Sequence, residues 1–136
     1  MSAGVKLLAV PAVALAVCAA AVFGLGDGRT LVSAPEVVAE DFVHAIRMER
    51  YSQAARHLSE EARARTGEDA LAGVRSRLEG ATGGIEDVRG EAGWIAGEKA
   101  EAVAVLRGRR APVRVGVRMA RENGEWRVTG MDGPTR

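Results

Sequence analysis

The sequence predicts an α+β domain in which short helices precede a four-stranded antiparallel sheet. Apolar residues recur at helical spacing between residues 33 and 79, whereas valine, glycine and turn signals dominate from residue 85 onward. The strongest local signal is a β-hairpin near the C-terminus. Its first strand, residues 113–121, alternates apolar side chains with Arg, Gly and Ala, and Asn123-Gly124 supplies the tight turn before Trp126.

Four segments between residues 33 and 84 have helical patterns. Ser33 and Glu36 resemble a capping box for a first helix that runs to about Arg50, and an apolar stripe from Tyr51 to Leu58 predicts a short second helix. Ser59, followed by two glutamates, predicts another helix start. Thr66 and Asp69 repeat the capping pattern before a last helix, which Gly80, Gly83 and Gly84 end. These three or four helices need a sheet to cover their apolar faces.

The sheet is predicted from four segments, which are residues 85–95, 99–107, 113–121 and 126–131. Gly90 and Gly93 weaken the first segment or mark a bulge in it. The second segment has alanines and Leu106 on one face and Val103 with Val105 on the other, so the sequence leaves its inward face open.

The N-terminus is directed to a membrane. Residues 7–25 carry no charge and just reach the roughly 20 residues that cross a bilayer. Three outcomes compete, namely an uncleaved anchor, cleavage near Ala21 followed by secretion, and lipidation at Cys18. We expect a signal-anchor segment at residues 1–25, a polar linker at 26–32 and one domain at 33–133, located outside the cytoplasm.

Composition excludes several kinds of site. The single cysteine lies in the apolar segment, so the domain has no cysteine set for zinc or a disulfide, and no metal or other cofactor is predicted. Residues 107–136 carry eight arginines against three acidic residues, whereas residues 33–101 are net acidic. Arg114, Arg118 and Arg127 are the candidates for a docking face toward the membrane surface or an acidic partner. Nucleic acid is not expected, because the net charge of the domain is near zero and its expected location is outside the cytoplasm.

Few side chains are suited to chemistry. Asp41, Tyr51 and His57 are candidates for a general base or a hydrogen-bond donor in a pocket, and Glu49 falls close to the apolar sector of the first helix. For each of them, a surface, capping or core role is the simpler interpretation. No catalytic residue is therefore assigned.

The order of these elements resembles the nuclear transport factor 2-like superfamily in its small exported bacterial form. The residues that carry the resemblance are the segment from Arg50 to Ser59 and the closing hairpin from Arg121 to Val128. The resemblance implies a cone in which a strongly curved sheet wraps the helices, and it implies no single activity. We expect a membrane-anchored, non-catalytic domain that binds a protein partner or dimerises through its sheet. The alternative is a small-molecule pocket protein or an isomerase-like or dehydratase-like enzyme.

Overall fold

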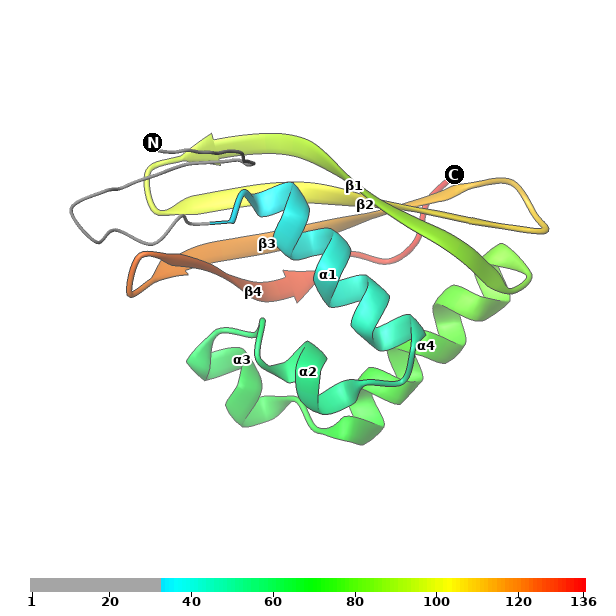
Figure 1. The fold of residues 1–136 in the computed structure, drawn as a ribbon, viewed down its shortest axis with the longest axis horizontal. Helices are drawn as coiled ribbons and strands as arrows, with labels where there is room; N and C mark the ends of the chain where they lie inside the picture. Colours follow the sequence, from blue (N-terminus) through cyan, green and yellow to red (C-terminus); the bar gives the residue numbers. More distant parts are fainter. Residues whose placement is uncertain (1–32) are drawn as a thin grey trace, which may run out of the picture. The chain divides into compact units, whose positions relative to one another are not determined.

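The computed structural model describes residues 33–136, and these fold into helices followed by a sheet, as predicted (Figure 1). The predicted membrane segment at residues 7–25 and the linker at 26–32 lie outside the described residues. None of the helices in the described part is long and apolar enough to cross a membrane. In chain order the elements are α1 (Pro35–Arg47), α2 (Tyr51–Ala55), α3 (Glu60–Arg65), α4 (Glu68–Thr82), β1 (Ile85–Ala96), β2 (Lys99–Gly108), β3 (Val113–Glu122) and β4 (Glu125–Met131).

The strands form one open antiparallel sheet in the order β1-β2-β3-β4. Asn123 and Gly124 both have positive φ, at 52° and 79°, which is the backbone that a two-residue hairpin turn requires. The predicted α+β class and the predicted turn are therefore confirmed. The register shifts twice in β1–β2, between Ile85 and Asp87 and near Gly93, and once in β3–β4 after Arg118.

The inward face of β2, which the sequence left open, is the face that carries alanine. Ala100, Ala102 and Ala104 are at most 1% exposed and lie opposite Met119, Val117 and Val115 of β3. Helix α1 crosses this face of the sheet (Figure 1). Because alanine and glycine have small or no side chains, they allow the helix backbone to approach the strands closely.

One close approach is at Gly90 of β1. A Cβ atom built on Gly90 would lie 2.0 Å from the Glu36 carbonyl oxygen of α1, so only glycine fits there. The Gly90 N–H donates to Glu40 Oε1 at 2.8 Å, which satisfies a backbone donor on an edge strand. The sequence associated Gly90 with a weakened strand or a bulge. In the structure, Gly90 is a position at which α1 packs directly against the sheet.

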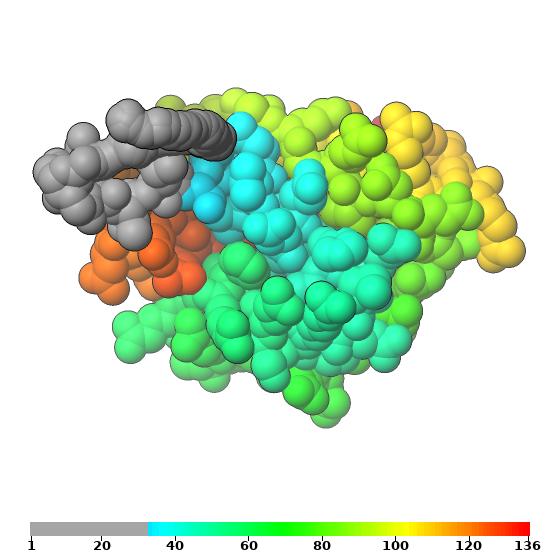
Figure 2. All heavy atoms as spheres, in the orientation of Figure 1, coloured from blue at the N-terminus to red at the C-terminus, as the bar shows by residue number. Residues whose placement is uncertain are grey.

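The apolar core lies between α1 and the sheet and extends under α4. Val38, Phe42, Ala45 and Ile46, which the periodicity placed on one face of the first helix, are all buried. In the space-filling view, α1 lies over the middle of the sheet (Figure 2). The core is completed by small and medium apolar side chains, with Trp126 at the β4 edge.

The helix starts agree only in part with the predicted caps. Ser59 accepts a hydrogen bond from the Ala62 N–H at 3.1 Å and caps α3, as predicted. Ser33 does not cap α1, because Ala34 occupies the N-cap position and Pro35 begins the helix. The predicted cap at Thr66 is also wrong, since Gly67 precedes α4 and no side chain caps it.

The segment from His57 to Ser59 is attached to the free edge of β4. The Val128 N–H donates to the His57 carbonyl at 2.7 Å, and the Ser59 N–H donates to the Val128 carbonyl at 2.9 Å. These two bonds hold the end of α2 and the start of α3 beside the sheet. They therefore position the two hollows that flank this segment.

Candidate functional site

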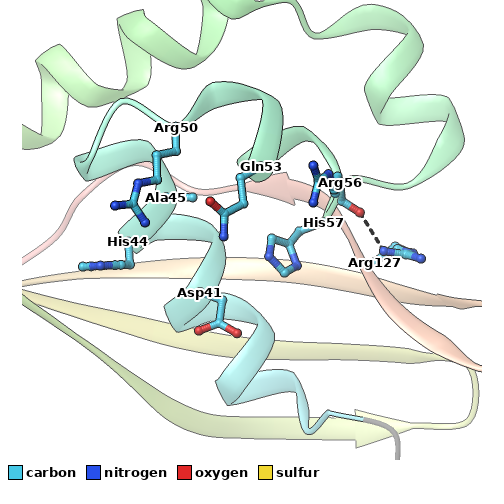
Figure 3. Close-up of a pocket in the computed structure, with 8 residues that line it drawn as sticks. All are labelled: Asp41, His44, Ala45, Arg50, Gln53, Arg56, His57 and Arg127. Carbon is cyan, nitrogen blue, oxygen red and sulfur yellow. Dashed lines mark hydrogen bonds between the residues drawn. The ribbon is translucent and has the colours of Figure 1, made fainter. Parts of the chain in front are cut away.

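The first hollow is a polar groove of about 400 Å³ between α1, α2 and β4 (Figure 3). Its lining residues are Asp41, His44, Ala45, Arg50, Gln53, Arg56, His57 and Arg127. We call this the polar groove. It brings together two of the predicted pocket residues, Asp41 and His57, with Arg127, which the sequence placed on a docking face.

The polar groove is held by backbone contacts and does not contain an assembled catalytic pair. Arg127 Nη1 donates to the Arg56 carbonyl at 2.6 Å, as drawn in Figure 3, and its guanidinium also pairs with Glu125. Within residues 33–136, no hydrogen bond joins Asp41 to His57. A general base would need such an orienting contact or a second polar group aimed at the same point. The groove instead presents three arginines around one carboxylate.

The surroundings of His57 in this groove change its proton affinity. Burial lowers the pKa of His57 below its usual value of 6.5; Asp41 opposes this by raising the pKa, and Arg127 and Arg56 lower it further. The folded protein thus keeps His57 neutral at pH values at which the unfolded chain binds a proton. The stability that this provides is present above about pH 6.5 and is lost as the pH falls toward the lower folded pKa.

We predict that His57 titrates below pH 6.5 in an NMR pH titration of its imidazole signals. The chain has two histidines, so a His44→Gln variant assigns the remaining signal. Asp41→Asn removes the carboxylate that favours the charged ring and should lower the midpoint further. A midpoint at or above 6.5, or an upward shift in the asparagine variant, would contradict this arrangement.

Glu49 and Tyr51 do not line either hollow. Helix α1 ends at Arg47, and Glu49 lies beyond it with a positive φ of 60°, exposed and 3.5 Å from the Arg75 guanidinium. The helical periodicity that placed Glu49 near the apolar sector therefore stops before reaching it. Tyr51 opens α2 and packs half-buried against the core.

The three arginines predicted to share a docking face have separate contacts. Arg114 pairs with Glu91 and Arg118 pairs with Asp132, at 2.7 and 2.8 Å. Arg127 reaches over the β4 edge to the polar groove. Because each of these charges already has an acidic partner in the folded chain, the three do not form an unpaired basic patch.

The second hollow is larger, at about 540 Å³, and no sequence pattern indicated it. It lies between α3 and α4 on one side and β4 with the C-terminal segment on the other. We call it the apolar pocket, and its lining residues are Phe42, Leu58, Ala62, Arg65, Thr66, Ala70, Leu71, Gly73, Val74, Arg77, Leu78, Arg118, Val128, Thr129, Gly130, Met131, Asp132, Gly133 and Pro134. Buried Leu71, Leu78 and Val128 form its floor, while Val74 and Met131 keep part of their surface exposed.

The rim of the apolar pocket is positively charged. Arg65 of α3 reaches across to donate to the Thr129 carbonyl of β4 at 3.2 Å. Arg118 extends past Gly130, where a Cβ atom would lie 2.5 Å from its Nη2 atom, and so reaches the rim from β3. Arg77 of α4 is the third arginine, and it forms no ion pair with another residue of 33–136.

The apolar pocket contains no evident acid–base chemistry. Its lining includes no His, Tyr or Cys, and its single carboxylate, Asp132, is paired with Arg118. Across the described residues, no three His, Cys, Asp or Glu side chains are grouped in a way that would hold a metal ion. The pocket thus combines an apolar floor with a positively charged rim.

Comparison with known proteins identifies the fold only. No protein-family model matches the chain, and no curated protein matches it. Among solved structures, the chain is similar to the solution structure of a SEC-C motif containing protein from Rhodopseudomonas palustris, at a TM-score of 0.50 and 14% identity. The match covers 73% of this chain and 77% of that protein.

The resemblance to the nuclear transport factor 2-like superfamily is therefore wrong. The solved structure described above is that of a SEC-C motif protein, and no family model supports the superfamily or its membrane-anchored form. The features behind the resemblance were helices followed by a meander and a charged hairpin around Asn123-Gly124. Those features are shared by unrelated α+β folds, because any tight hairpin selects the same turn residues.

Proposed function

We propose that this protein is a non-catalytic binding domain whose binding site is the apolar pocket. The observation that carries the proposal is the composition of the lining: an apolar floor below a rim of arginines, without a free acid or base. Pockets of a few hundred Å³ with mostly apolar walls and a few polar groups are typical of ligand-binding sites. This favours a pocket ligand over a partner docked on the outer sheet face, where Arg114 is already paired with Glu91.

The proposal is tested by binding of an uncharged apolar probe, 1-decanol, to the full chain in phosphatidylcholine nanodiscs. Methyl NMR signals of Leu71, Val74 and Met131 should shift on addition of the probe. Ala70→Trp places an indole at the exposed wall of the pocket and should abolish these shifts. Ala64→Trp is the matched control, because Ala64 is an exposed helical alanine that does not line the pocket. Shifts that are absent, or equal in both variants, would contradict the proposal.

We further propose that residues 7–25 anchor the domain outside the cytoplasm, with secretion after cleavage near Ala21 as the alternative. The support is the uncharged run of nineteen residues and the polar linker that follows it. Alkaline phosphatase, which folds only after export, should be active when fused after Arg136. An inactive fusion that is expressed at normal levels would refute the external location.

A further inference from the structure

We infer that the ligand of the apolar pocket is an amphipathic monocarboxylate, that is, an apolar body that ends in one carboxylate. This inference rests on the proposed function and specifies the chemistry of the same site. The inference depends on the arginines at the rim and on which of them already contact another residue. The sequence candidates for a pocket did not include any of these residues.

The wall that a ligand would touch is apolar. Ala70 and Gly73 of α4 are exposed, and Val74 and Met131 are half-buried, so these four positions present surface to the pocket above its close-packed floor. Contact between water and this apolar surface is unfavourable. An apolar ligand that covers the wall removes the wall and its own apolar surface from water. The first requirement on the ligand is therefore an apolar body.

The charge around the opening favours an anion over an uncharged or cationic ligand. Arg65, Arg77 and Arg118 surround the pocket, whereas Asp132 is the only acidic residue of its lining. An uncharged or cationic ligand would leave this excess of positive charge uncompensated next to an apolar body. A carboxylate at the rim would instead form charge-assisted hydrogen bonds with a guanidinium.

The contacts of the three arginines favour a single negative charge. Arg118 is paired with Asp132 at 2.8 Å, and Arg65 donates to the Thr129 carbonyl and lies 3.8 Å from Glu61. Arg77 has no acidic partner within residues 33–136, and it is exposed on the α4 side of the opening. Arg77 is thus the rim guanidinium that has no acidic partner within residues 33–136, and one such guanidinium matches one carboxylate.

The test compares decanoate with 1-decanol and decyltrimethylammonium, which share the same chain and differ in charge. Each is titrated into the full chain in phosphatidylcholine nanodiscs, and the methyl signals of the pocket are followed by NMR. We expect decanoate to bind most tightly. Because Arg77 is exposed, its replacement by Gln should weaken decanoate binding by about three- to tenfold, and it should weaken 1-decanol binding less.

Arg63→Gln is the matched control. Arg63 is an exposed helical arginine of α3 that does not line the pocket, so this variant should bind decanoate as the wild type does. The nanodisc takes up the same share of decanoate with every variant, and the ratio of affinities between variants is therefore unaffected by partitioning. Unchanged far-ultraviolet circular dichroism establishes that each variant is folded.

The outcomes separate this inference from the proposed function. Binding of 1-decanol that Ala70→Trp blocks would support the pocket as a binding site. If, in that case, decanoate binds no more tightly than 1-decanol, or Arg77→Gln does not weaken decanoate binding, the inference of a monocarboxylate is wrong. Equal or tighter binding of decyltrimethylammonium would also overturn the inference. If none of the three compounds shifts the pocket signals, the proposed function itself fails.

Discussion

Replacing Trp126 with alanine should destabilise the domain by about 3 to 5 kcal/mol, the usual cost of removing a large buried aromatic side chain. Trp126 is 4% exposed at the start of β4, where it closes the core at the edge of the sheet. The Arg121 guanidinium lies 4.6 Å from the centre of its ring and covers the outer side. The free energy of unfolding is measured by urea denaturation followed by circular dichroism.

Trp94→Ala is the matched control for this prediction. Trp94 is 50% exposed on β1 and donates one hydrogen bond to Glu101 at 3.1 Å, so its removal leaves no cavity in the core. We expect a change within about 0.5 to 1 kcal/mol, as for other surface substitutions. Equal losses for the two variants would show that Trp126 does not close the core as described.

Replacing Gly90 with alanine should destabilise the domain by about 3 kcal/mol, at the upper end of the range for overpacked sites. The added Cβ atom would meet the Glu36 carbonyl oxygen at 2.0 Å and its carbon at 2.9 Å. Both are backbone atoms of α1, so no side chain can rotate away and the helix itself must move off the sheet. The Gly90–Glu40 hydrogen bond would be strained by the same movement.

Gly80→Ala provides the control with the same chemical change. Gly80 lies in α4, and a Cβ atom there has no neighbour within 4 Å. Alanine in a helix interior should stabilise the protein by about 0.5 to 1 kcal/mol, since glycine has the lower helix propensity. The two substitutions should therefore have opposite signs in urea denaturation. If Gly80→Ala destabilised the protein as much as Gly90→Ala, a steric clash with α1 would not explain the effect at Gly90.

The sequence predicted the candidate site less well than it predicted the elements around it. It selected Asp41 and His57 because both are titratable side chains in the helical half, and both line the polar groove. It missed the apolar pocket, whose wall residues Ala70, Gly73 and Met131 are ordinary helix and strand residues. No local pattern indicates that such residues keep exposed surface, since exposure depends on how α4 packs beside β4.

The charged residues show the same limit. Alternation along β3 correctly separated Arg114 and Arg118 from the buried valines, because side chains of a strand alternate between its two faces. It did not reveal their partners, Glu91 and Asp132, which lie 23 and 14 residues away along the chain. These pairs depend on strand order and on the path of the C-terminal segment.

The sequence by itself determined the α+β class, the Asn123-Gly124 turn and the Ser59 cap. Each of these is decided by a few neighbouring residues: by backbone freedom at positive φ, by a side-chain cap, or by the period of a helix or strand. Only the tertiary structure decided that the alanine face of β2 is buried, that Gly90 contacts α1, and that an apolar pocket opens between α4 and β4. Those features arise from the distances between segments far apart in the chain, and local spacing carries no information about such distances.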